Sequence, residues 1–110
     1  MNITDRLRAD LITAMRERDK LRVTTVRALI AAIDNAGAVE IDGQGFDYDP
    51  KIGLNHDVDR RDVTIDDIQR IILSERDDLI AARDEYRFLG DNDRADELEH
   101  RAEIVATYLA

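Results

Sequence analysis

Apolar side chains recur at intervals of three and four residues along most of this 110-residue chain. Such spacing lines one face of an α-helix, which turns once every 3.6 residues, and it predicts four helices, over residues 4–18, 20–37, 64–89 and 92–109. The apolar stripes are Ile3, Leu7, Leu11, Ala14 and Met15; Val23, Val26, Leu29, Ile30, Ile33 and Ala36; Ile65, Ile68, Ile71, Ile72, Leu79, Ala82, Tyr86 and Leu89; and Ala95, Leu98, Ala102, Val105 and Leu109. We expect an all-α fold in an antiparallel four-helix arrangement, with residues 1–110 forming a single domain.

Residue types at the expected helix ends indicate where the first two helices begin and end. Thr4 is a candidate N-cap for the first helix and Asp19 for the second, because short polar side chains accept hydrogen bonds from the free amides of a first turn. Residues 18–20 can form the turn between the two helices. A single bent helix is the alternative, since no glycine or proline interrupts the pattern there. Gly37 is located where a C-terminal cap is expected.

The third and fourth helices carry clearer boundary signals. Thr64 and Asp67 have the spacing of a capping box, and Gly90 is placed to end the third helix. Asp91 or Asp93 is then the cap of the fourth helix. Because so few residues separate these two helices, we expect them to form an antiparallel hairpin.

Residues 38–63 do not continue the helical pattern. Val39 and Ile41 alternate toward a glycine-containing turn, and Phe46 and Tyr48 alternate away from it, as in a small β-hairpin. An isolated hairpin is only marginally stable in water. We therefore favour a long flexible loop between the second and third helices and keep the small β-hairpin as the alternative.

No motif in the chain indicates catalysis. The loop contains Asp42, Asp47, Asp49, Asp57 and Asp59, but an EF-hand calcium loop aligned from Asp42 or from Asp47 has the central glycine or the closing glutamate in the wrong place. His56 and His100 are far apart, neither has a second histidine at metal-ligand spacing, and the chain has no cysteine. Acidic residues of the last two helices have arginines nearby at helical spacing, which is typical of a solvent-exposed, salt-bridged face. We predict no catalytic residue, no cofactor site and no metal site.

The net charge of −9 is unevenly distributed. Residues 1–40 carry seven basic and six acidic side chains, whereas residues 41–110 carry nine basic and nineteen acidic ones. Because neutralisation of phosphates drives non-specific nucleic-acid binding, an RNA contact would have to use the N-terminal part. The candidate RNA-contacting residues are Arg16, Arg18, Lys20, Arg22 and Arg27. The alternative interpretation is that these side chains pair with Glu17, Asp19 and acids of the third helix and serve solubility.

Several motifs, taken in order, resemble a known family. The first half contains Leu7-x-x-Asp10-Leu11-x-x-Ala14-Met15, Asp19-Lys20-x-Arg22, Thr25 with Arg27, and Ala32-Ile33-x-Asn35-Ala36. The second half contains Arg76, Glu85-Tyr86 before Gly90, and Tyr108-Leu109. Over residues 3–36 and 64–109 the chain resembles the GatB/YqeY domain family, also called the YqeY-like proteins.

The resemblance implies an all-α domain related to the C-terminal region of the B subunit of glutamine-dependent tRNA amidotransferases. In those enzymes the related region helps to engage tRNA and is not where the chemistry happens. The resemblance therefore links the family to carbon–nitrogen ligase activity, with glutamine as the amide donor, only through the enzyme that contains the related region. The chain departs from the family pattern where Gly37 replaces an acidic residue and where Tyr108-Leu109-Ala110 replaces Tyr-Leu-Pro and a following tail-like helical module. Both departures weigh against a strong tRNA interaction.

The expected function is accordingly that of a non-catalytic accessory that binds tRNA weakly or binds an amidotransferase subunit. The alternative is an acidic protein–protein interaction module unrelated to amidation. No apolar run approaches a bilayer span and the first ten residues lack the apolar core of a signal peptide, so we expect a cytoplasmic protein without a membrane partner. The third helix is longer than the first and fourth, which leaves part of its apolar face for a second copy in a homodimer.

Overall fold

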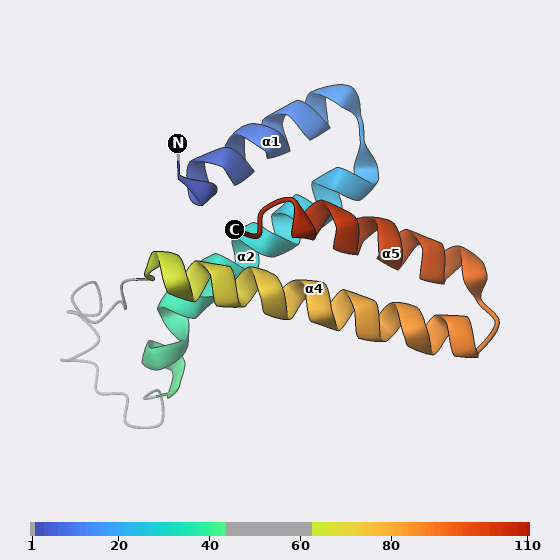
Figure 1. The fold of residues 1–110 in the computed structure, drawn as a ribbon. Helices are drawn as coiled ribbons and strands as arrows, with labels where there is room; N and C mark the ends of the chain where they lie inside the picture. Colours follow the sequence, from blue (N-terminus) through green and yellow to red (C-terminus); the bar gives the residue numbers. More distant parts are fainter. Residues whose placement is uncertain (1, 44–62) are drawn as a thin grey trace.

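Over the residues that the structure describes, the chain folds into four α-helices, which confirms the all-α prediction. The computed structural model describes residues 2–43 and 63–110, with the side chains of 38–43 left undescribed. The helices are α1 (Ile3–Glu17), α2 (Lys20–Gly43), α4 (Ile65–Phe88) and α5 (Asn92–Ala106). In Figure 1, α4 and α5 lie side by side and antiparallel, α2 crosses them, and α1 packs on α2. The long loop or β-hairpin predicted between the second and third helices falls mainly on residues 44–62, which lie outside the described residues.

The two N-terminal helices are separate, as their polar residues suggested. Arg18 ends α1 in the left-handed conformation, with φ of 59°, so the chain changes direction there and does not continue as one bent helix. Asp19 caps α2 as predicted, because its Oδ1 accepts a hydrogen bond from the Arg22 amide at 3.2 Å. The cap of α1 was predicted wrongly. Asn2, not Thr4, accepts from the Asp5 amide, at 2.8 Å.

Gly37 does not end α2, contrary to the prediction. It is a buried residue in the helical conformation, and α2 continues to Gly43. A glycine ends a helix efficiently when it adopts a positive φ, which Gly37 does not. In a helix interior it costs only about 0.5–1 kcal/mol relative to alanine. Alanines at 36 and 38, the strongest helix formers, flank it, so this local cost is too small to stop the helix.

The boundaries of the α4–α5 hairpin match the sequence signals. Thr64 Oγ1 accepts from the Asp67 amide at 3.1 Å and Asp67 Oδ2 accepts from the Thr64 amide at 3.2 Å, which completes the capping box. Gly90 follows α4 with φ of +81°, and Asp91 caps α5 through the Arg94 amide at 3.2 Å. Across the hairpin, Arg87 Nη1 lies 3.0 Å from Asp96 Oδ1. These contacts hold the two helices in register.

The hydrophobic core draws on all four helices and on the turn after α5. Its buried members are Leu7, Val26, Leu29, Ile33, Ile72, Ile104, Val105 and Tyr108. Three residues predicted for the core are instead exposed, namely Met15 at 50%, Leu89 at 73% and Ile65 at 76%. Ile65 and Leu89 are the outermost positions of the predicted third-helix stripe. The closed end of the α4–α5 hairpin projects past α1 in Figure 1, so no neighbouring helix covers Leu89.

The turn after α5 ties the C-terminus to α1. The Tyr108 hydroxyl donates to Asp10 Oδ2, and the Arg6 guanidinium lies 4.5 Å from the centroid of the Tyr108 ring. Arg6 Nη2 also donates to the Thr107 carbonyl at 3.1 Å. Tyr108 is 2% exposed, as expected for a tyrosine that packs in the core with its hydroxyl at the edge.

Candidate nucleic-acid interface

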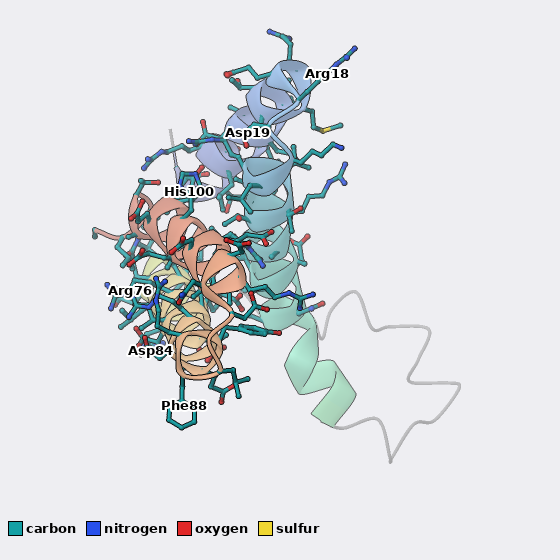
Figure 2. All side chains as sticks on the ribbon, turned by 90° about the vertical axis from the view of Figure 1, so that its right-hand side faces the viewer. Arg18, Asp19, Arg76, Asp84, Phe88 and His100 are labelled. Atoms are coloured by element: carbon teal, nitrogen blue, oxygen red, sulfur yellow. The ribbon has the colours of Figure 1, made fainter. Side chains whose placement is uncertain are left out.

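The junction of α1 and α2 brings several basic side chains to one corner of the molecule. The left-handed Arg18 lets the Asp19 amide donate to the Ala14 carbonyl at 2.9 Å, which closes α1 and starts α2 one residue later. Arg16 in the last turn of α1, Arg18 at the junction and Lys20 at the start of α2 are therefore close neighbours. All three side chains are exposed, and Arg18 points outward from the corner in Figure 2.

The five candidate RNA-contacting residues are not equivalent. Arg22 is half-buried and its Nε lies 3.5 Å from Asp19 Oδ2, so its charge is partly engaged. Arg27 is exposed and its Nη2 donates to the Met15 sulfur at 3.9 Å. No ion pair joins Arg16, Arg18, Lys20 or Arg27 to any residue that the structure describes. We call these four residues the basic corner. The predicted pairing with neighbouring acids holds for Arg22 alone.

An acidic recess adjoins the basic corner. It has a volume of about 180 Å³ and is lined by Asp10, Thr13, Glu17, Asp19 and Arg22. A phosphate group placed in this recess would face three carboxylates, which opposes binding at close range. A polyanion therefore has to approach the basic corner from outside the recess, where the unpaired cations are.

The histidines and acidic residues do not assemble a second site in the part of the chain that the structure describes. His100 is exposed, with its Nδ1 3.9 Å from Glu103 Oε2, and His56 lies outside the described residues. Residues 2–43 and 63–110 contain no group of three histidine, cysteine or acidic side chains arranged to hold a metal ion. Burial raises the pKa of the Glu75 carboxyl, Asp78 raises it further and Arg101 lowers it. Among the described helices none is long and apolar enough to cross a membrane.

A second exposed surface, which was not predicted from the sequence, lies at the closed end of the α4–α5 hairpin. Phe88 is 90% exposed beside the exposed Leu89, and Asp84 and Glu85 border the same open depression. Figure 2 shows Phe88 pointing away from the body of the molecule. We call these four residues the hairpin tip. The available signal was the position of Phe88 off the apolar stripe of α4, directly before the turn.

Comparison with known proteins assigns no family or function to the chain. No protein-family model, no curated protein and no solved structure matches the chain.

Proposed function

We propose that this protein is a non-catalytic accessory domain of the GatB/YqeY type, which contacts the tRNA backbone for a glutamine-dependent amidotransferase. The observation that carries the proposal is the basic corner, whose four cations are exposed and unpaired among the described residues of a chain with a net charge of −9. Carbon–nitrogen bond formation, with glutamine as the amide donor, would take place on the amidotransferase. The role of this chain is to position RNA.

The side chains of the basic corner suit the phosphate backbone more than base edges. Arginine offers a planar fork that binds phosphate oxygens through two hydrogen bonds, and lysine acts as a point charge. Each neutralised phosphate releases counterions, so three contacts give a slope of about −2.1 to −2.7 in a plot of log affinity against log salt concentration. Such a small slope corresponds to weak, sequence-independent binding.

The rest of the molecule opposes free-standing RNA binding. Residues 41–110 carry nineteen acidic and nine basic side chains, and their field repels a polyanion at low ionic strength. The acidic recess beside the basic corner adds to this repulsion at short range. We therefore infer that a partner enzyme supplies most of the tRNA affinity and that the basic corner fixes orientation.

The proposal is tested by titrating tRNA against the protein at several low salt concentrations. The double variant Arg18→Gln/Lys20→Gln should lower the affinity and reduce the salt slope by about 1.4 to 1.8, because two phosphate contacts are lost. Arg22→Gln should change the slope much less, since Asp19 already engages Arg22.

The matched control is Arg70→Gln/Arg94→Gln, which removes the same charge from two exposed arginines on α4 and α5. This control should leave the salt slope unchanged. Equal loss of binding in the control and in Arg18→Gln/Lys20→Gln would mean that only net charge matters. That outcome would remove the basic corner from consideration.

A second candidate function is a protein–protein interaction module unrelated to amidation. The observation that favours it is the 90% exposure of Phe88 at the hairpin tip, because a large exposed apolar side chain rimmed by polar residues is typical of interaction surfaces. Affinity purification of the native protein separates the two functions. Amidotransferase subunits retained by a Phe88→Gln variant support the accessory role, whereas unrelated proteins lost with that variant support the interaction module.

A further inference from the structure

Two apolar surfaces are exposed at different ends of the fold, one with acidic and one with basic residues around it. The first is the hairpin tip, where Phe88 and Leu89 are 90% and 73% exposed next to Asp84 and Glu85. Residues 83–97, which surround the tip, carry six carboxylates and three arginines. The surroundings of this apolar surface are therefore acidic.

The second surface lies on the outer face of α1. Ile12 and Met15 are 57% and 50% exposed and are neighbours on the helix, because residues three apart share a face. Arg8 and Arg16 lie one turn before and one turn after Ile12, and Arg27 from α2 contacts the Met15 sulfur. These three arginines are exposed and form no ion pair with any residue in 2–43 or 63–110. We call Ile12 and Met15 the α1 apolar pair, and its surroundings are basic.

We propose that the hairpin tip of one copy of this chain docks on the α1 apolar pair of a second copy. Phe88 and Leu89 would cover Ile12 and Met15. The Glu85 carboxylate would face the unpaired arginines around the pair, together with Asp84, which Arg83 of its own chain already engages at 2.9 Å. The two surfaces are complementary in charge, and each has an apolar centre that the fold leaves uncovered. The inference goes beyond the proposed RNA contact and does not depend on it.

The directions of the two surfaces determine the kind of assembly. In Figure 2, Arg18 at the end of α1 and Phe88 at the hairpin tip lie at opposite edges of the molecule and point away from each other. One chain therefore cannot satisfy the contact within itself. The contact is heterologous, so each added copy leaves one free tip and one free α1 apolar pair.

The size and charge of the contact set its strength. Two apolar side chains from each copy form a patch well below the roughly 1,200 Å² that stable complexes bury, so the association is weak and transient. The net charge of −9 makes copies repel at long range. At about 0.15 M salt this repulsion is screened beyond roughly 8 Å, whereas the opposite charges at the contact still attract.

The test is sedimentation velocity of the full chain at about 0.15 M salt, from roughly 10 μM to 1 mM protein, the range of weak contacts. The wild type should show a sedimentation coefficient that rises with concentration. The tip variant Phe88→Gln/Leu89→Gln and the α1 variant Ile12→Gln/Met15→Gln should each lose this rise. The matched control Ile65→Gln/Leu73→Gln removes two other exposed apolar side chains and should keep it.

Sedimentation of an equimolar mixture of the tip variant and the α1 variant is the decisive experiment. Each variant retains one working surface, so the mixture should form a 1:1 dimer and nothing larger. A monomeric wild type across the concentration range would overturn the proposal, as would a mixture that stays monomeric. Equal loss of association in the Ile65→Gln/Leu73→Gln control would place the contact elsewhere and would also overturn it. Far-UV circular dichroism verifies that each variant is helical before it is compared.

Discussion

Replacing Tyr108 by Phe should loosen the attachment of α1 to the rest of the bundle. Tyr108 is 2% exposed, and its hydroxyl donates to Asp10 Oδ2 on α1. The substitution removes this hydrogen bond and keeps the ring, so the packing and the Arg6 contact over the ring at 4.5 Å are retained. The change in stability therefore reports the Tyr108–Asp10 bond and little else.

The size of the effect follows from the environment of the acceptor. A hydrogen bond to a charged group contributes about 1.5–3 kcal/mol to stability. The Asp10 side chain is 36% exposed, so water can solvate its carboxylate once the hydroxyl is gone. We therefore expect the lower end, a loss of about 1.5 kcal/mol, which corresponds to a fall of about 6 °C in Tm for a domain of this size.

Urea unfolding of four proteins measures the bond, namely the wild type, Tyr108→Phe, Asp10→Asn and the double variant. Because both single changes disrupt one bond, the double variant should be less destabilised than the sum of the two, by about 1 kcal/mol. Additive effects, or a Tm change below about 1 °C for Tyr108→Phe, would show that the Tyr108–Asp10 hydrogen bond does not stabilise the fold.

Other changes test the core, the caps and the pH dependence. Ile72→Asp places a charge at a fully buried position and should abolish the helical far-UV signal, since its cost approaches the whole stability of a domain. Thr64→Ala should cost about 1 kcal/mol in urea unfolding through loss of the capping box. Gly90→Ala should cost about 1–2 kcal/mol from its φ of +81° alone, because the new Cβ meets no atom within 4 Å. Burial, followed by the Asp10 hydrogen bond, raises the pKa of Tyr108 above its usual value near 10. Its contribution to stability should thus be complete below about pH 10 and be lost at higher pH, more in the wild type than in Tyr108→Phe.

The helices and most of their ends could be predicted because the signals are local. The spacing of apolar residues reports the helical period, and the Thr64 capping box joins residues three positions apart. Gly37 shows the limit of such signals. A glycine marks a helix end only when the surrounding chain lets it take a positive φ, and the alanines around Gly37 favour continuation.

Exposure and long-range contacts could not be read from local spacing. Leu89 follows the apolar stripe of α4 but is 73% exposed, because α1 and α2 do not reach the closed end of the α4–α5 hairpin. Arg87 pairs with Asp96 and Glu99 across the hairpin, and spacing along a single helix does not indicate these contacts. The Tyr108–Asp10 bond joins residues 98 positions apart, and nothing in either segment indicates it.

The position of the basic cluster along the chain could be read from the sequence, but the pairing of its side chains could not. The excess of basic residues near 16–27 pointed to the α1–α2 junction, and the structure places Arg16, Arg18 and Lys20 there. Which cations remain unpaired depends on the rotation of each side chain about its helix, so Arg22 next to Asp19 could be distinguished from the others only in three dimensions.

The measurement that tests the basic corner most directly is a titration of the isotopically labelled full chain with tRNA, followed by amide NMR at low salt. If the basic corner contacts RNA, the largest chemical-shift changes occur at residues 16–27, and they shrink in Arg18→Gln/Lys20→Gln. Binding that shifts the amides of α5 or the hairpin tip and leaves residues 16–27 unchanged would show that RNA does not contact the basic corner.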